Sequence, residues 1–208
     1  MRWLPCGDAA AIIELDDLTE VLRLSAAIDV ERTAGRLDGV VDVVPAARTV
    51  LVRCRSDGTL TRVAHHIATL EPATQPPVTG TQVRIPVRYG GADLHRVAAL
   101  LDVDEPEVVR RHVDTLWQVA FTGFAPGFGY LVAADGSRPL EVPRHAEART
   151  SVPVGAVGLA GEFSGVYPRS SPGGWQLIGS TDVVLWDVER DPPALLTPGT
   201  LVRFEEVR

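Results

Sequence analysis

The chain has 208 residues, with 45% hydrophobic and 23% charged side chains and a formal net charge of −7 at pH 7. This length suits one large or two small domains, and the composition is that of an ordinary soluble globular protein. No apolar run approaches the roughly 18 residues that a membrane-spanning helix needs. The negative charge, with no cluster of arginines and aromatic residues to offset it, argues against a nucleic-acid partner.

Lysine is absent, because all 20 basic residues are arginine. A P-loop needs a lysine for its phosphates, a Schiff-base enzyme needs an amine, and a biotin or lipoyl carrier needs a lysine to modify. The sequence therefore excludes these three chemistries for this chain. Its two cysteines, Cys6 and Cys54, fit neither a metal spacing nor a disulfide framework, so we expect them to be reduced and structural. No apolar segment precedes Cys6, which argues against a lipoprotein leader and for a cytoplasmic protein.

The first part of the chain alternates strand-like and helix-like patterns. A capping box at Asp17 and Glu20 predicts the start of the first helix. The predicted elements are strands at 10–15, 40–44, 49–54 and 81–87, and helices after Asp17 and over 60–68. Their βαββαβ order is typical of a ferredoxin-like unit. The proline-rich segment 72–80 is typical of a linker, so we predict an α/β domain at 1–80 and a second domain at 81–208.

The second part begins with two predicted helices and continues with strands. Asp93 is placed to cap a helix over 94–101, and a capping box at Asp104 and Glu107 opens another that runs through Leu116. From Trp117 to Phe204 short apolar runs alternate with glycine and proline turns, which predicts a barrel or a sandwich. The fold class is therefore α+β.

More than half of the 19 glycines lie between Gly123 and Gly179, in three apolar glycine phrases at 123–131, 151–161 and 171–179. Such density predicts either tight turns or backbone N–H groups that face a ligand. The phrases match neither a nucleotide-binding fingerprint nor a Gly-x-Ser-x-Gly nucleophile elbow.

Five polar residues in or near these phrases are candidates for function. His112 is either a half-buried structural histidine or a general acid or base. Arg149 suits a carboxylate or phosphate, or forms a surface ion pair with Glu147 or Glu141. Tyr130, Ser171 and Gln176 either line a pocket or satisfy buried backbone groups. The other histidines, His65, His66, His95 and His145, lack ligand spacing, so we predict no bound transition metal.

The glycine phrases resemble one family. Gly123-Phe-x-Pro-Gly-Phe-x-Tyr-Leu131, the series from Arg149 to Gly161, Gly165-Val-Tyr-Pro168 and Ser171-Pro-Gly-Gly-Trp-Gln-Leu-Ile-Gly179 resemble the B subunit of bacterial 5-oxoprolinase. That family is also called allophanate hydrolase subunit 1, or the KipI family. Pro86–Gly91, His112 and Pro198–Phe204 fit its pattern, so the resemblance covers nearly all of the later domain and, more loosely, the first.

The resemblance implies a ferredoxin-like domain followed by a cyclophilin-like barrel. It implies a protein that works with the C subunit of 5-oxoprolinase, a second barrel protein, and with its A subunit to hydrolyse 5-oxo-L-proline to L-glutamate with ATP and Mg²⁺. This chain alone is then inactive, with nucleotide bound through the complex and no biotin attached here. The family also suggests two alternatives: inhibition of a histidine kinase, as in KipI, and a carboxyltransferase or allophanate hydrolase-like role in urea metabolism.

The resemblance also implies site residues. His112, Arg149 and Tyr130 are the expected catalytic residues, and the residues expected to bind substrate or an anion are Phe124, Gly127, Gly161, Ser171, Gln176 and Thr181. The chain departs from the family pattern at Ser180, where arginine is common, at Gly129, where proline or another residue is usual, and at Glu162-Phe163, where a more polar pair is usual. Loss of the arginine puts the choice of substrate in question.

Overall fold

A computed structural model describes residues 1–70 and 81–208 of the chain. The chain divides into two compact units, Met1–Pro77 and Val78–Arg208. The predicted linker at 72–80 lies outside the described residues. No helix in the described part of the chain is long and apolar enough to cross a bilayer.

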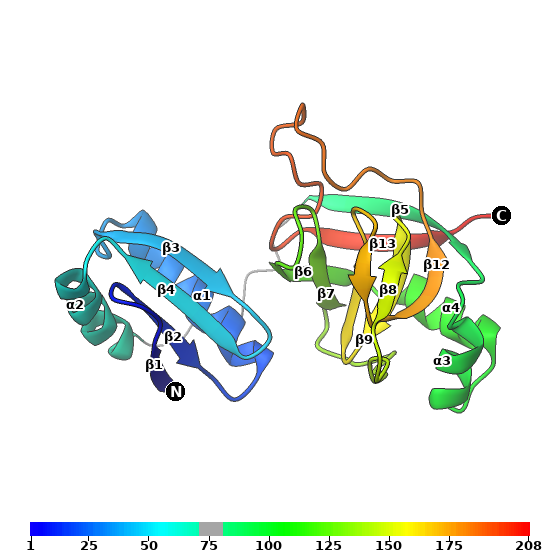
Figure 1. Ribbon diagram of the computed structural model, residues 1–208, viewed down its shortest axis with the longest axis horizontal. Helices are drawn as coiled ribbons and strands as arrows, with labels where there is room; N and C mark the ends of the chain where they lie inside the picture. The colour runs from blue at the N-terminus through cyan, green and yellow to red at the C-terminus, as the bar shows by residue number, and fades with distance from the viewer. Residues whose placement is uncertain (71–80) are drawn as a thin grey trace. The chain divides into compact units, whose positions relative to one another are not determined.

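The first unit is a 4-stranded antiparallel sheet in the order β1-β2-β4-β3, with two helices packed on it (Figure 1). Its elements are β1 (Arg2–Pro5), β2 (Ala10–Glu14), α1 (Leu18–Thr33), β3 (Val40–Pro45), β4 (Thr49–Cys54) and α2 (Asp57–Ala68). Val50, Val52 and Cys54 alternate along β4 with more exposed residues, as expected for a strand that buries one face. The Asp17 side chain accepts a hydrogen bond from the Glu20 N–H, so the predicted cap of α1 is confirmed.

The predicted βαββαβ order was wrong at both ends. A strand absent from the sequence prediction, β1, pairs with β2 and takes an edge of the sheet. The strand predicted at 81–87 is β5 (Gln82–Tyr89), and it belongs to the second unit. The strand expected to complete a ferredoxin-like domain pairs instead with β13, in the second unit. The ferredoxin-like assignment of the first unit stays a prediction.

The second unit contains a closed barrel, which decides between the barrel and the sandwich. Its strands run in the order β10-β7-β6-β13-β5-β12-β9 (Figure 1). Besides β5 they are β6 (Trp117–Thr122), β7 (Gly129–Ala133), β9 (Ala156–Ala160), β10 (Phe163–Val166), β12 (Gln176–Ser180) and β13 (Leu201–Glu206). β13, the last strand, pairs in parallel with β5, so the two ends of the unit meet in the wall. A separate ribbon joins β8 (Arg149–Val152) to β11 (Ser171–Gly173).

Two helices, α3 (Leu94–Leu100) and α4 (Glu105–Asp114), pack on the barrel strands β12 and β13. The Asp104 carboxylate accepts from the Glu107 N–H, so the predicted N-cap of α4 is confirmed. The Glu107 carboxylate accepts from Arg110 and Arg111 and does not complete a capping box with Asp104. The predicted cap of α3 was wrong in one respect. Asp93 stands at the N-cap position, but its side chain makes no bond to the helix. It faces the barrel instead.

Candidate functional site

An aromatic cluster explains much of the glycine density. The aromatic cluster consists of Phe121, Phe124, Phe128, Tyr130, Phe163, Tyr167 and Trp175. It draws on the first and third glycine phrases, on Phe121 just before the first, and on Phe163 and Tyr167 between the second and the third. The Phe128 and Trp175 rings, for example, meet edge to face with centroids 5.3 Å apart. The first and third phrases, far apart in sequence, therefore meet through their rings.

Three glycines lie against these aromatic side chains. A Cβ on Gly165 would come within 3.0 Å of both Phe128 and Trp175, and one on Gly158 would lie 3.1 Å from the Trp175 Cβ. A Cβ on Gly173 would overlap the Tyr167 hydroxyl. These glycines are required for close packing of rings on backbone.

Tyr130 belongs to this cluster. Its ring stacks on Phe121 with centroids 4.4 Å apart. Burial raises the pKa of the Tyr130 phenol, and the nearby Arg144 guanidinium partly opposes this. Tyr130 lines neither of the two cavities described below. Its observed contacts are those of a packing residue.

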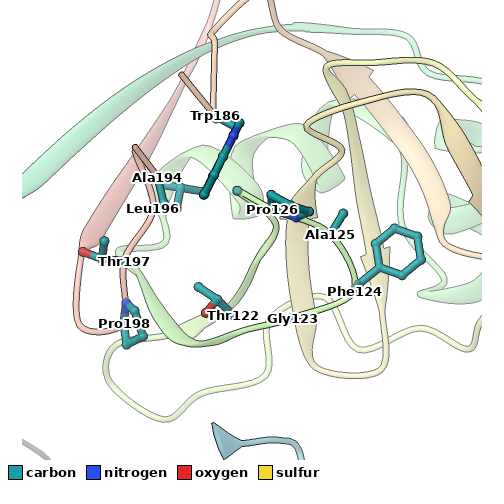
Figure 2. A pocket seen from close by; sticks show the side chains of 11 residues that line it. Thr122, Gly123, Phe124, Ala125, Pro126, Trp186, Ala194, Leu196, Thr197 and Pro198 are labelled. Carbon is teal, nitrogen blue, oxygen red and sulfur yellow. The ribbon is translucent and has the colours of Figure 1, made fainter. Parts of the chain in front are cut away.

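The first cavity, the β6–β7 groove, has a volume of about 440 Å³. Its lining comes from the β6–β7 turn and the segment before β13, and consists of residues 122–127, Trp186, Ala194 and residues 196–198 (Figure 2). Phe124 is 58% exposed and has a φ of 67°, which is uncommon for a bulky residue. Gly127, with a φ of 83°, lies so close to Trp186 and Leu185 that a side chain would crowd them. Both expected binding residues therefore lie on this groove.

The second cavity, the arginine cavity, also has a volume of about 440 Å³. It opens between the end of β5, the turn after it, and strands β8, β9 and β12. Its lining is Arg88, Tyr89, Gly90, Gly91, Ala92, Arg149, Ser151, Pro153, Ala156, Leu177, Gly179 and Ser180. Both charged residues of the lining are arginines.

Arg149 is anchored in this wall by Asp93, not by Glu147 or Glu141. Arg149 Nη2 donates to Asp93 Oδ1 over 2.6 Å, and Nη1 donates to the Trp175 carbonyl over 3.4 Å. Asp93 Oδ2 accepts from the Leu177 N–H over 2.7 Å, and the Asp93 N–H donates back to the Leu177 carbonyl. The carboxylate thus ties α3, β8 and β12 together and orients the guanidinium.

The charge of Asp93 is stabilised although the residue is 5% exposed. Burial alone would raise the pKa of its carboxyl, but the Leu177 N–H, Arg149 and His145 together hold that pKa below its ordinary value. His145 Nε2 lies 3.1 Å from Asp93 Oδ1 and forms an ion pair when the imidazole is protonated. Arg149 therefore faces an ionised carboxylate at neutral pH.

Arg88 forms an exposed ion pair, in contrast to the partly buried pair of Arg149. Its Nη2 donates to Asp182 Oδ2 over 2.7 Å, but the Arg88 side chain is 47% exposed and that of Asp182 83% exposed. Solvent screens a pair of this kind, and its net stabilisation is about 0–1 kcal/mol. Arg88 is thus held far less firmly than Arg149.

His112 is fully buried and hydrogen-bonded on both ring nitrogens. Nδ1 lies 2.7 Å from the Tyr89 hydroxyl and Nε2 lies 2.8 Å from Ser164 Oγ. The ring stacks on Phe204. Burial lowers the pKa of His112 to about 3, so the imidazole is neutral at physiological pH. The hydrogen bond to Tyr89, which lines the arginine cavity, links His112 to that cavity.

The remaining four expected binding residues lie outside both cavities. The Gln176 amide donates to the Pro143 carbonyl, and its buried Oε1 has no hydrogen-bond partner within the described ranges. Ser171 Oγ is likewise buried and without a partner there. Thr181 Oγ1 accepts from the Val183 N–H, and Gly161 pairs with Val142 in an isolated bridge. None of these four lines either cavity.

The structure thus separates the expected site residues. Arg149 lies in the arginine cavity with His112 behind it, Phe124 and Gly127 lie on the β6–β7 groove, and Tyr130 lies in the aromatic cluster. Sequence reasoning missed Arg88 and treated Asp93 as a helix cap only. The alternation along 82–89 could have indicated that Arg88 points out of the barrel core, but nothing local pairs Asp93 with a residue 56 positions away.

The described ranges contain no group of three or more His, Cys, Asp or Glu side chains placed to hold a metal ion. Cys6 is exposed and Cys54 buried, and both are free thiols.

Residues 1–196 match the family model described as carboxyltransferase domain, subdomain C and D. The chain belongs to this family. Within it, the chain is 39% identical to the 5-oxoprolinase B subunit of Escherichia coli O157:H7 over 95% of its own length and 92% of that protein. It is 43% identical to the 5-oxoprolinase B subunit of Bacillus subtilis over 60% of its length and 52% of that protein.

Solved structures share the fold. The conserved uncharacterized protein PH0987 from Pyrococcus horikoshii is 29% identical, with a TM-score of 0.58 and coverage of 99% of this chain and 97% of that one. Urea carboxylase of Kluyveromyces lactis is 21% identical with a TM-score of 0.79, and this chain spans 22% of it. The second likeness is one of fold alone.

Proposed function

We propose that this chain is the B subunit of a cytoplasmic, ATP-dependent 5-oxoprolinase complex that hydrolyses 5-oxo-L-proline to L-glutamate. The observation that carries the proposal is the 39% identity to a protein named as the B subunit of 5-oxoprolinase, which extends over nearly the full length of both chains. The C subunit, a second barrel protein, and the A subunit are its proposed partners, and the chain alone is proposed to be inactive.

ATP and Mg²⁺ belong to the complex in this proposal. The chain has no lysine, so it has no Walker lysine for the phosphates of a nucleotide. The nucleotide is therefore proposed to bind through the partner subunits or at an interface with them. A covalently attached biotin is excluded by the same absence of lysine.

Arg149 is the residue of this chain best placed to act on an anion. It lines the arginine cavity, and Asp93 holds its guanidinium in one orientation without displacing it from the wall. A fixed cation in a partly buried cavity stabilises a carboxylate or a developing oxyanion more than a mobile one, because little reorganisation is needed. His112 is buried and neutral, so any proton that it exchanges with the cavity passes through Tyr89.

The test is ATP-dependent release of glutamate from 5-oxo-L-proline by this chain with the A and C subunits, and with each omitted in turn. Activity only in the full mixture supports the proposal. In that mixture Arg149→Ala should lower the rate about tenfold or more. Arg84→Ala, on the same barrel but outside the arginine cavity, is the matched control. A normal rate for Arg149→Ala with normal assembly would remove Arg149 from the mechanism.

A carboxyltransferase role in urea metabolism is the second candidate, because the matching family is described as a carboxyltransferase domain. A well-formed complex that does not hydrolyse 5-oxoproline would favour this or a related amide substrate. Failure to assemble with the A and C subunits, together with binding to a histidine kinase, would favour the kinase-inhibitor alternative.

A further inference from the structure

The arginine cavity has two guanidinium groups in its walls, and each is paired with a carboxylate that does not line the cavity. Arg88 lies on β5 and Arg149 on β8, and no carboxylate is part of the lining. The partners of both arginines, Asp182 and Asp93, lie outside the cavity proper. A cavity with two guanidinium groups in its walls favours an anionic ligand.

Arg88 and Arg149 differ in how easily each can leave its present partner to bind an anionic ligand. Arg149 is held by the buried Asp93, which also accepts from the Leu177 N–H, so moving it would break a connected network. Arg88 has a single, exposed partner, Asp182. A carboxylate ligand can replace the Asp182 carboxylate with little loss, because it offers the same hydrogen bond in a less exposed place.

The rest of the lining suits a compact organic anion. Leu177, Ala156 and Pro153 provide apolar surface, while Ser151 and Ser180 add hydroxyl groups. A volume of about 440 Å³ lies within the usual range for small-molecule pockets. Free phosphate would contact the guanidinium groups but has no apolar part to pack against Leu177, Ala156 and Pro153.

We infer that Arg88 is the anchor for the carboxylate of a small ligand in the arginine cavity, and that Asp182 competes with the ligand for it. This inference rests on the proposed function in one respect: 5-oxo-L-proline is then the carboxylate concerned, bound through a group that does not react. Arg88 would determine specificity for acids over neutral lactams, a role that neither the glycine phrases nor Arg149 supplies.

The test measures binding to the full isolated chain by calorimetry, with three probes: 5-oxo-L-proline, its neutral counterpart 2-pyrrolidinone, and cyclopentanecarboxylate. We expect both acids to bind and the neutral lactam to bind at least about tenfold more weakly. Arg88→Ala should weaken both acids by a similar factor and leave the neutral lactam unchanged. Asp182→Asn should strengthen both acids, because it removes the competing carboxylate.

The ion pair of Arg84 with Glu205 provides matched control variants. Arg84 and Glu205 form an exposed ion pair on β5 and β13 that does not line the cavity. Arg84→Ala and Glu205→Gln should leave binding of all three probes unchanged. Equal binding of acids to Arg88→Ala and to the unaltered chain, or no binding of either acid to the unaltered chain, would overturn the inference. Arg88-dependent binding without turnover in the full complex would leave the inference standing and count against the proposed function alone.

Discussion

Replacing Asp93 with alanine should destabilise the barrel unit far more than replacing the exposed Asp182. Asp93 is 5% exposed and accepts hydrogen bonds from the Leu177 N–H and from Arg149. Its removal leaves a buried N–H without a partner, which costs about 1–3 kcal/mol. Loss of the charged bond to Arg149 adds about 1 kcal/mol, discounted because that side chain is 30% exposed. We expect a total loss of about 3 kcal/mol in the free energy of unfolding.

The assay is urea denaturation of the full chain, followed by tryptophan fluorescence. Trp117, Trp175 and Trp186 lie in the barrel unit, so a Trp3→Phe background makes the signal report on that unit alone. Asp182→Ala is the control, since its exposed pair with Arg88 predicts a loss below about 1 kcal/mol.

The effect of Asp93 should also depend on pH with a definite sign. The folded pKa of Asp93 lies below its ordinary value of 3.8, so its stabilisation is present above pH 3.8 and is lost as the pH falls through the folded pKa. The difference between the unaltered chain and Asp93→Ala should therefore shrink only under acid conditions. A loss for Asp93→Ala no larger than that for Asp182→Ala would refute the assignment of Asp93 as the central tie.

Three further predictions concern the buried His112, the crowded Gly165 and the ion pair of Arg36 with Glu31. Burial lowers the pKa of His112 to about 3 from 6.5, so the free energy of unfolding should fall as the pH drops below 6.5, by up to about 1.4 kcal/mol per pH unit. In urea denaturation His112→Gln should lose this pH dependence, and an equal dependence in both proteins would contradict the prediction. Gly165→Ala forces a Cβ against two aromatic rings and should lower the free energy of unfolding by about 1–3 kcal/mol. Gly123→Ala is the control, because a Cβ there would lie 3.9 Å from its nearest neighbour atom and should change stability by less than about 0.5 kcal/mol. Similar melting curves for the two variants would count against the packing role of Gly165. The hydrogen bond from Arg36 is the main reason that the pKa of Glu31 is about 2, so Arg36→Ala should raise the NMR titration midpoint of Glu31 toward 4.5, and an unmoved midpoint would show that Arg36 is not the cause.

Local signals in the sequence were sufficient for several elements. The caps at Asp17 and Asp104 were predicted because each depends on a side chain and a backbone N–H three residues apart. The strands after Trp117 were predicted as a group because apolar runs between turns are also a local pattern. The closed barrel itself required pairing of β13 with β5, more than a hundred residues apart in the chain.

The sequence by itself determined the residue types available, the helix starts, the exclusion of lysine chemistry and, through its phrases, the family. Only the tertiary structure decided what the polar and glycine residues do. Gly158, Gly165 and Gly173 are packing surfaces for rings, and Asp93 is the partner of Arg149. The physical reason is that a glycine phrase has the same local pattern whether a ring or a ligand covers it, and a capping aspartate looks the same whether it bonds its helix or a distant arginine. Those alternatives differ only in contacts between residues far apart in sequence, and the fold alone brings such residues together.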